Sequence, residues 1–393
     1  MPLADALVKE ENLAKPELKF PLTVVFSPSS ALLQIRESVD PEVLFCRDYP
    51  YYSSFSDQIL EHSRRNVESL IEKRGLGAKS LAVELASNDG YLLKNYVESG
   101  IPVLGIDPAE GPAKTAEKRG VKTLNTFFTR ELAEKLRAEG TAADVIHANN
   151  VLAHVRDLNG FVAGIGTLLK ENGVAVIETP YVRDLIDHCE FDTIYHEHLC
   201  YYSVTSLRYL FGRHGLFVNH VEHLPVHGGS LRVFVEKKES PSKEVLAYLA
   251  DEKERGLDRI DYYRDFAERV EGVKKRLVHM LQTLKQQGKT IAAYGAAAKG
   301  ATLINYMGID RSLVSFVVDR NVHKHGRYMP GQRIPIFPTE KLLEDQPDYV
   351  LILAWNFRDE IMRQQSAYGE RGGRFIVPIP EPVVVEPQAA ATR

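Results

Sequence analysis

Ionisable side chains crowd into one short segment of this chain. It runs from Phe191 to Ser203 and reads Phe-Asp-Thr-Ile-Tyr-His-Glu-His-Leu-Cys-Tyr-Tyr-Ser, so that Tyr195, His196, Glu197 and His198 are consecutive. Histidine and tyrosine can act as base and acid near neutral pH, so the segment predicts a proton-transfer site. The alternative is a loop whose polar side chains satisfy each other's hydrogen bonds.

The two histidines of this segment also raise the question of a metal. His196 and His198 stand at i and i+2, so they do not share a helix face, and the pattern is not the HExxH of zinc proteases. In an extended segment the two rings would share a face, and a two-histidine metal site without an obvious third ligand stays open. We favour proton transfer and expect no metal here.

The stretch from Leu81 to Gly90 begins the scaffold that must position these residues. It is a short apolar strand that breaks into the turn Asn88-Asp89-Gly90. A strand that ends in a small polar turn brings backbone N–H groups close to a ligand. Asp107 ends the next strand, about 20 residues further on, where a carboxylate accepts both hydroxyls of a ribose. The alternative is an ordinary turn between packed elements.

The remaining strands of this sheet decide between two classes of ligand. Strands are expected at 121–124, 143–148 and 173–178, followed by 216–222 and 230–236. The link between the last two is too short for a parallel crossover, so they must form an antiparallel hairpin. Sheets that bind NAD carry GxGxxG and continue in parallel, and this sheet lacks GxGxxG. A seven-stranded sheet with a terminal hairpin resembles the class I S-adenosylmethionine-dependent methyltransferases.

The regions before and after this sheet have other sequence patterns. Before it, 20–26 and 32–35 predict a hairpin, and the aromatic and hydroxyl cluster at 49–56 suits either a polyol ligand or packing on a neighbouring domain. After it, 239–287 is charged and helical. From Thr290 a strand, a Gly-rich turn and a helix begin a second Rossmann-like unit, whose turn predicts either a diphosphate site or a plain helix start.

Composition sets the outer limits. The chain has 393 residues, 44% hydrophobic and 26% charged, with a net charge of −4, which predicts a globular protein of two or three domains without a nucleic-acid or membrane surface. Cys46, Cys189 and Cys200 have no CxxC spacing, so neither a disulfide framework nor a thiolate zinc site is expected. No signal peptide and no apolar run of about 18 residues is found, so we expect a cytoplasmic location.

Together these motifs resemble the bacterial sugar C-methyltransferases that act on nucleotide-linked keto-deoxysugars. The resemblance extends over nearly the whole chain and is carried by Tyr49 to Ser54, Val83 to Leu92, Ala148 to His154, Asp192 to His198 and His227 to Arg232. It implies an α/β fold with a class I methyltransferase core, a second Rossmann-like C-terminal domain and a small N-terminal subdomain. The expected boundaries are 1–68, 69–238, 239–287 (a helical bridge) and 288–393. It also implies a role in deoxysugar and antibiotic biosynthesis.

One departure from this family concerns zinc. Its members begin with a small zinc-binding domain that holds two cysteine pairs. The upstream pair is missing from this sequence, and Ser27 and Ser30 stand where the second pair is expected. Serine hydroxyls are poor replacements for thiolates. We therefore expect a metal-free remnant, and no zinc.

The resemblance also implies a mechanism. The family's substrates carry a ketone at C4, which acidifies the proton at C3. His198 is the candidate base, Glu197 orients or tunes it, and Tyr195 donates to the enolate oxygen. The enolate carbon then takes the methyl group, with S-adenosylhomocysteine as the product and no need for a metal. The other catalytic candidates are Tyr49, Tyr51 and His154.

The cofactor candidates are Glu84, Ala86, Asn88, Asp89, Gly90, Tyr91, Asp107, Pro108, Asn149, Asn150 and Val151. The candidates for binding the nucleotide-sugar are Ser53, His196, His227, Gly228, Arg232, Tyr294, Gly295, Lys299, Asn356 and Arg358. We expect a monomer or a dimer. Three alternatives stay open: a dehydrogenase with tandem dinucleotide domains, a non-catalytic binder of sugar nucleotides, and a methyltransferase whose acceptor is not a sugar.

Overall fold

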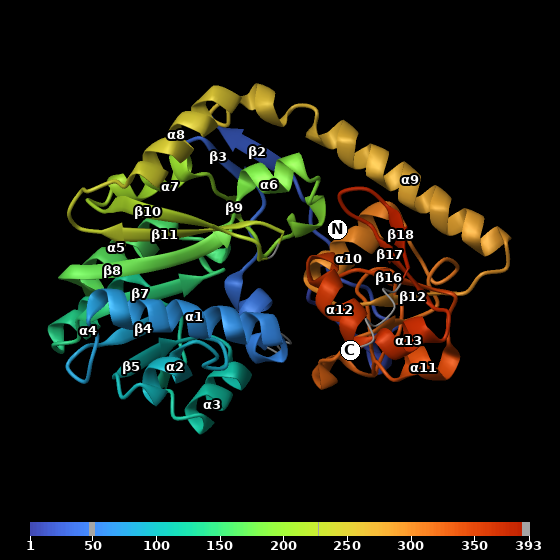
Figure 1. The fold of residues 1–393 in the computed structure, drawn as a ribbon, viewed down its shortest axis with the longest axis horizontal. Helices are drawn as coiled ribbons and strands as arrows, with labels where there is room; N and C mark the ends of the chain where they lie inside the picture. The colour runs from blue at the N-terminus through green and yellow to red at the C-terminus, as the bar shows by residue number, and fades with distance from the viewer. Residues whose placement is uncertain (47–51, 227, 387–393) are drawn as a thin grey trace, which may run out of the picture.

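A seven-stranded sheet forms the larger part of the molecule. The computed structural model describes residues 1–46, 52–226 and 228–386, and this sheet has the order β10-β11-β8-β7-β4-β5-β6 (Figure 1). Its strands are β4 (Ala82–Leu85), β5 (Val103–Ile106), β6 (Thr123–Leu124), β7 (Ala143–Asn149), β8 (Leu169–Pro180), β10 (Phe217–Leu224) and β11 (Ser230–Glu236). Strands β4 to β8 pair in parallel, whereas β11 is antiparallel to both β8 and β10. The predicted terminal hairpin and class I methyltransferase core are confirmed.

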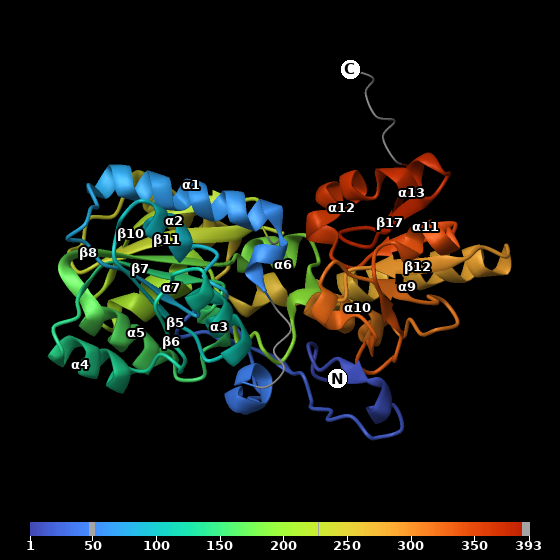
Figure 2. The same ribbon diagram turned by 90° about the horizontal axis from the view of Figure 1, so that it is seen from below.

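Helices cover both faces of this sheet, and so its central strands are apolar along their length. Every residue of β4 is buried, as expected for a parallel strand between two helical layers. Figure 2 shows α1 and α2 on one face and α4 and α5 on the other. The helices are α1 (Asp57–Arg74), α2 (Leu93–Glu98), α3 (Glu110–Lys118), α4 (Arg130–Ala138), α5 (Leu158–Leu168), α6 (Val182–Asp187) and α7 (Val204–Gly212).

The C-terminal domain has its own six-stranded sheet, with the order β15-β13-β12-β16-β17-β18. Strands β12, β13, β15, β16 and β17 pair in parallel and β18 is antiparallel to β17, which confirms a second Rossmann-like unit. Its strands are β12 (Ile291–Tyr294), β13 (Val317–Val318), β15 (Ile336–Phe337), β16 (Tyr349–Ile352), β17 (Arg374–Val377) and β18 (Val383–Val385). Its helices are α10 (Ala298–Met307), α11 (Lys341–Asp345), α12 (Arg358–Gln364) and α13 (Ser366–Glu370).

Two long helices connect the two sheets. They are α8 (Lys243–Arg255) and α9 (Phe266–Gln286), and a short 3-10 turn at Ile260–Tyr263 separates them, so the helical region expected over 239–287 is interrupted there. Buried residues of α9 at helical spacing, from Val270 to Leu284, belong to the core of the C-terminal domain. Figure 1 shows α9 along the outer edge of that domain. The division of the chain at residues 68, 238 and 287 stays a prediction.

The N-terminal region contacts both sheets. Strands β2 (Val24–Ser27) and β3 (Leu32–Ile35) form the expected hairpin, and β9 (Cys200–Tyr201) joins it as a third strand that the sequence did not predict. Earlier in the chain, β1 (Val8–Lys9) pairs with β14 (Arg327–Tyr328). The first residues therefore lie against the C-terminal domain, as Figure 2 shows.

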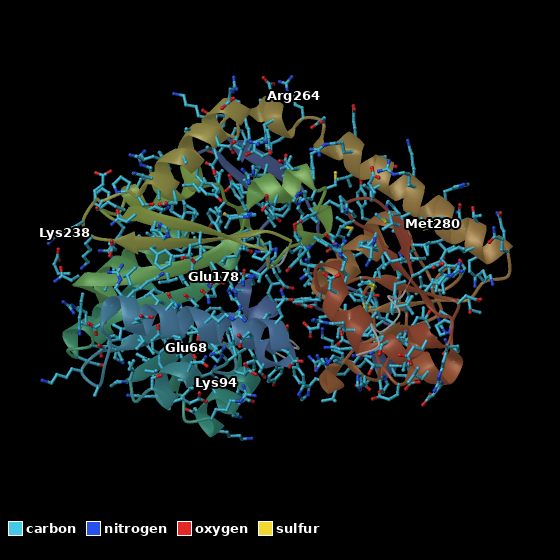
Figure 3. All side chains as sticks on the ribbon, in the orientation of Figure 1. Glu68, Lys94, Glu178, Lys238, Arg264 and Met280 are labelled. Carbon is cyan, nitrogen blue, oxygen red and sulfur yellow. The ribbon has the colours of Figure 1, made fainter. Side chains whose placement is uncertain are left out.

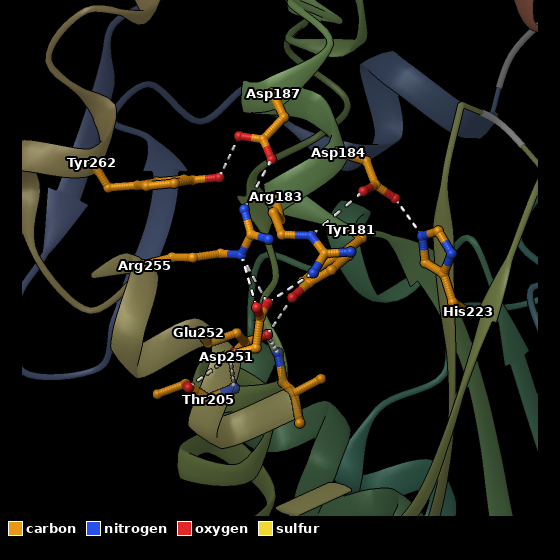
Figure 4. A network of polar contacts seen from close by, with 11 residues as sticks. Tyr181, Arg183, Asp184, Asp187, Thr205, His223, Asp251, Glu252, Arg255 and Tyr262 are labelled. Carbon is orange, nitrogen blue, oxygen red and sulfur yellow. Dashed lines mark hydrogen bonds and ion pairs between the residues drawn. The ribbon is translucent and has the colours of Figure 1, made fainter. Parts of the chain in front are cut away.

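A buried carboxylate ties down both ends of the insertion between β8 and α7. Glu252 of α8 is 0% exposed. It accepts hydrogen bonds from the Tyr181 hydroxyl, which follows β8, and from the Val204 and Thr205 N–H groups at the start of α7, each at 2.8 Å. Figure 4 shows this network, including the Asp184–His223 contact. The segment with the predicted proton-transfer residues is therefore held at both of its ends.

No helix among the described residues is long and apolar enough to cross a membrane.

Candidate active site

The turn after β4 is aimed at the acid that ends β5. Ala86 and Asn88 adopt positive φ angles of 56° and 49°, a conformation that non-glycine residues keep only where the surroundings hold it. The Asn88 N–H donates to Asp107 Oδ2 and the Ala109 N–H donates to Oδ1, both at 2.8 Å. Burial raises the pKa of Asp107 to about 6. The turn and the acid thus form one rigid unit.

Most of the predicted cofactor residues line one cavity of about 640 Å³. Asn149 at the end of β7 brings a buried Oδ1 atom that has no hydrogen-bond partner within the described part of the chain, so a ligand would satisfy it. Together with Asp107 across the strand ends, this arrangement fits S-adenosylmethionine. The predicted residues that line the cavity here are Ala86, Asn88, Tyr91, Asp107, Pro108, Asn149, Asn150 and Val151.

Three predicted cofactor residues support the turn from behind instead. Asp89 pairs with Arg119 at 3.0 Å and accepts from the Ser54 hydroxyl at 2.5 Å. A Cβ on Gly90 would lie 3.0 Å from Val121 Cγ2, so glycine allows close packing there. Glu84 is buried, and burial followed by the charge of Asp107 raises its pKa well above the ordinary value. These three do not line the cavity.

The predicted proton-transfer residues meet in the same cavity. His198 Nδ1 lies 2.7 Å from the Thr193 carbonyl oxygen, so this nitrogen carries a proton and donates it. The other nitrogen, Nε2, therefore carries the lone pair of the neutral ring, and it lies 2.9 Å from Tyr195 Oη, which can donate to it. The His154 ring packs edge-on against His198 with centroids 4.7 Å apart. Burial lowers the pKa of His154 to about 4, so that ring is neutral at pH 7.

The two residues between Tyr195 and His198 have partners from the N-terminal region. Glu197 hydrogen-bonds Asp5 from the N-terminal region, and both line the cavity. His196 Nε2 lies 2.9 Å from the Pro21 carbonyl oxygen, and its ring packs against Phe20. The expectation that His196 binds substrate is not supported, because its ring is taken up by this packing and does not line the cavity.

The cavity continues into the C-terminal domain, where Lys299 and Asn356 line it. Lys299 Nζ lies 4.6 Å from the Trp355 ring centroid and has no hydrogen-bond partner among the described residues. Burial lowers the Lys299 pKa, although Asp192 opposes this. Both amide atoms of Asn356 are also buried without a partner in the described ranges. Such groups indicate a site for a polar, anionic ligand.

The other predicted substrate residues fall into three groups. Ser53 lines the cavity, and its N–H donates to Asn88 Oδ1 at 2.9 Å. Arg232 does not line it, because its guanidinium is held by Glu178 at 2.7 Å and Glu222 at 3.0 Å. The others that do not line it are Gly228, Tyr294, Gly295 and Arg358. His227, Tyr49 and Tyr51 lie outside the described residues.

Gly295 illustrates why a glycine can be needed without touching a ligand. Its φ is 98°, and a Cβ there would lie 2.8 Å from the Ala354 Cβ. This residue shapes the turn that leads into α10 and brings Lys299 to the cavity.

Sequence reasoning gave no role to four polar residues, of which Asp5, His62 and Glu178 line the cavity and Asp192 interacts electrostatically with Lys299. Asp5 lies in a stretch without any motif. His62 of α1 lies 2.9 Å from Glu178 Oε2 at the end of β8, the edge that faces the C-terminal domain in Figure 3. Burial would raise the pKa of Glu178, but the hydrogen bond from His62 and the charge of Arg232 hold it at about 2. Burial raises the pKa of Asp192 to about 7, and its Oδ2 accepts from the Trp355 indole at 2.7 Å.

Three family models match the chain. A model of a C-methyltransferase C-terminal domain matches residues 225–380 and a methyltransferase domain matches residues 59–221. A model described as "Putative zinc binding domain" matches residues 1–45.

Among characterised proteins, the C-methyltransferase NovU of Streptomyces niveus is 37% identical over 391 residues, which cover 99% of this chain and 93% of that protein. A ubiquinone biosynthesis O-methyltransferase of Azorhizobium caulinodans is 25% identical over 124 residues, 31% of this chain and 47% of that protein. A solved structure of magnesium protoporphyrin IX methyltransferase from Synechocystis with bound SAM has a TM-score of 0.35 and 12% identity, and it covers 46% of this chain and 79% of that one.

The match to a zinc-binding model is at odds with the expectation of no zinc. Ser30 Oγ donates to Ser27 Oγ at 2.9 Å, so these two hydroxyls pair with one another. No group of three or more His, Cys, Asp or Glu side chains suited to a metal is found in the described part of the chain. The residues at this hairpin therefore do not fit zinc, and a metal-free hairpin stays our prediction.

Proposed function

The chain belongs to the family of S-adenosylmethionine-dependent C-methyltransferases, and from this premise we propose that its acceptor is a nucleotide-linked 4-keto-deoxysugar. The methylated atom is then the ring carbon next to the ketone. The acceptor, the base and the diphosphate contacts below are all parts of this proposal.

One observation carries it: a single cavity joins three kinds of group. At one end lies Asp107 with the turn after β4, suited to a nucleoside. In the middle lie Tyr195 and His198, suited to move a proton. At the other end lie Lys299 and Asn356, suited to a diphosphate. In a nucleotide-sugar the charged diphosphate is likewise separated from the reactive carbon of the sugar ring, so the two could contact different parts of this cavity.

His198 is the proposed base. With Nδ1–H bound to the Thr193 carbonyl oxygen, Nε2 is the nitrogen that accepts the proton from the carbon next to the ketone. Tyr195 Oη, 2.9 Å from Nε2, then lies within reach of the oxygen on which the enolate charge develops. A preorganised donor of this kind is typically worth about 10²–10³ in rate. The neutral His154 ring packs edge-on against His198 and helps to hold its orientation.

S-adenosylmethionine, when bound, supplies a methyl group already activated by its sulfonium, and the enolate carbon accepts that methyl. The protein therefore has to position the acceptor, remove the proton and exclude water, and no metal has to be invoked for these tasks. Asp107 and Asn149 would hold the donor in place at the strand ends.

Lys299 and Asn356 are the proposed diphosphate contacts. Both side chains keep unmatched hydrogen-bonding atoms at the cavity wall, as judged over the described residues. Lys299 is the second residue of α10, and the N-terminus of this helix also favours an anion. A buried ammonium without a partner is costly, and an anionic ligand removes that cost.

The test is to incubate the purified protein with S-adenosylmethionine and a panel of dTDP-4-keto-sugars, and to analyse the products by mass spectrometry. A gain of one methylene on a sugar nucleotide supports the proposal. The matched control omits the 4-keto group from the same sugars. Methylation of reduced sugars, or of non-sugar acceptors alone, would overturn the choice of acceptor.

A further inference from the structure

The segment of residues 1–20 is fixed to the C-terminal domain and reaches the proton-transfer residues. Val8 and Lys9 pair with Tyr328 and Arg327. Glu17 accepts from the Gly331 N–H at 2.6 Å and pairs with Arg333 at 3.0 Å. Ala4 belongs to the hydrophobic core of the C-terminal domain. Asp5, the next residue, therefore has little freedom to move away from the cavity that it lines.

Asp5 comes from the N-terminal region and Glu197 from the insertion between β8 and α7, and their carboxyl groups form a hydrogen bond. Two carboxylates in contact repel each other, so such a pair holds one proton between its oxygens. Glu197 is 3% exposed, and water screens this repulsion little.

The surroundings decide which partner is the anion. Burial raises the pKa of both groups; for Glu197 the charge of Asp5 raises the pKa further, while for Asp5 the Lys324 ammonium opposes the rise. Lys324 itself is fixed by the Ala296 carbonyl at 2.8 Å, and Asp319 also faces the pair. The neutral His154 ring interacts with the Glu197 backbone through a hydrogen bond. These neighbours favour a neutral Glu197 that donates to an ionised Asp5.

We propose that Asp5 is a positioning residue of the methyl-transfer reaction, which shares one proton with Glu197 so that the pair carries a single negative charge beside His198. One charge stabilises His198 when it takes up the substrate proton. A second charge would oppose the enolate that forms at the same moment. The inference rests on the proposed function for its kinetic readout, but the shared proton can be measured without turnover.

The kinetic test compares isosteric amides. Glu197→Gln and Asp5→Asn each keep one negative charge and one N–H donor, whereas the double variant has no charge. We expect Asp5→Ala and the double variant to lose about 10–100-fold in kcat. We expect each single amide variant to lose less than Asp5→Ala. Equal losses in all four variants, or additive losses in the double variant, would show that Asp5 only packs the segment.

The pH dependence of kcat distinguishes a shared proton from a purely structural role of Asp5 in fixing residues 1–20. In the wild type, kcat should fall at high pH as the shared proton is lost. That falling limb should be absent in Asp5→Asn and Glu197→Gln, because an amide does not titrate. Glu17→Gln is the matched control: it loosens the same segment away from the cavity and should keep the limb. A wild type without such a limb overturns the proposal, even if the variants fold poorly.

Infrared difference spectroscopy then measures the proton without any substrate. Other buried acids, such as Glu84 and Asp192, also have raised pKa values, so the spectra are compared as differences in which these groups cancel. Near neutral pH, the wild-type minus Glu197→Gln spectrum should contain the carbonyl stretch of one protonated carboxyl group, and the wild-type minus Glu17→Gln spectrum should not. If no such band appears in the Glu197→Gln difference, no proton is shared. If the band appears but the wild type methylates no keto-sugar, the proposed function fails while the acid pair stands.

Discussion

Tyr195 Oη lies 2.9 Å from His198 Nε2, and the opposite ring nitrogen lies 2.7 Å from the Thr193 carbonyl oxygen. The backbone therefore fixes the tautomer of His198, and the tyrosine marks where its lone pair points. The proposed base and the proposed hydroxyl donor therefore lie side by side. This relationship is the basis of the first prediction.

His198→Asn should lower kcat by about 10²–10⁴, because a positioned general base contributes that much. The Asn amide can still donate to Thr193 but cannot take up a proton. Affinity for S-adenosylhomocysteine, measured by calorimetry, should stay near the wild-type value. His214→Asn is the control, because His214 contacts Asn159 at 3.1 Å outside the cavity. Wild-type turnover in His198→Asn would refute His198 as the base.

Binding of S-adenosylhomocysteine should weaken in mild acid because of Asp107. Burial raises its pKa to about 6, so the carboxylate that is proposed to accept the ribose hydroxyls is progressively protonated as pH falls through that value. Each pH unit below about 6 should raise Kd about tenfold if one proton is involved. Calorimetry from pH 5 to 8 measures this slope. Asp107→Asn should bind more weakly throughout and show no such slope, and a slope that survives in this variant would assign the proton to another group.

Lys299→Gln should raise KM for the nucleotide-sugar by about tenfold or more, since hydrogen bonds to charged groups contribute about 1.5–3 kcal/mol. The cofactor end of the cavity is untouched, so S-adenosylhomocysteine affinity should not change. Lys289→Gln is matched in chemistry and lies in the same domain, where it pairs with Asp348 at 3.0 Å. An equal KM increase in both variants would point to a general electrostatic effect and not to a diphosphate contact.

The hairpin of β2 and β3 should contain no zinc. Ser27 and Ser30 pair through their hydroxyls, and serine is a poor zinc ligand. Elemental analysis of freshly purified protein should find far less than one zinc per chain, and chelators should leave the melting temperature unchanged. Stoichiometric zinc would show that the family's zinc site persists with other ligands.

Glu252→Ala should destabilise the protein by about 3–5 kcal/mol, because it leaves several buried donors without an acceptor. Denaturant unfolding measures this loss. Glu254→Ala on the same helix is the control, since that residue is exposed. The Glu252 variant should also lose turnover at temperatures where it is still folded, because the insertion with Tyr195 and His198 is no longer held at both ends. Full activity in a destabilised Glu252→Ala variant would show that the hydrogen bonds of Glu252 stabilise the fold without contributing to catalysis.

Part of this architecture could be predicted from local patterns. The short link before Ser230 required the hairpin that the sheet contains. The ligand turn at Asn88 and the proton transfer read from the residue types around Tyr195 and His198 stay predictions, although the structure brings these residues to one cavity. Each of these features depends on residues that are close in sequence. Strand periodicity and turn chemistry are local properties, so they can be derived without knowing the fold.

What could not be predicted depends on contacts between distant parts of the chain. His196 was expected at the substrate, yet its partner Pro21 lies 175 residues away. Arg232 was expected there too, but Glu178 holds it at 2.7 Å. Asp5 has no motif, and only the docking of its segment brings it to Glu197. The direction in which a side chain points follows from tertiary packing, which a single sequence does not specify.

The pairing of β1 with β14 also constrains the order of events in synthesis. Val8 and its partner Tyr328 are separated by about 320 residues. At about 5–20 residues per second, a ribosome needs on the order of tens of seconds to connect them. The seven-stranded sheet can fold during this interval, whereas the segment with Asp5 can dock only when the last third of the chain has been synthesised. Until then Glu197 lacks its partner Asp5, so the pair of acids can form only after translation is nearly complete.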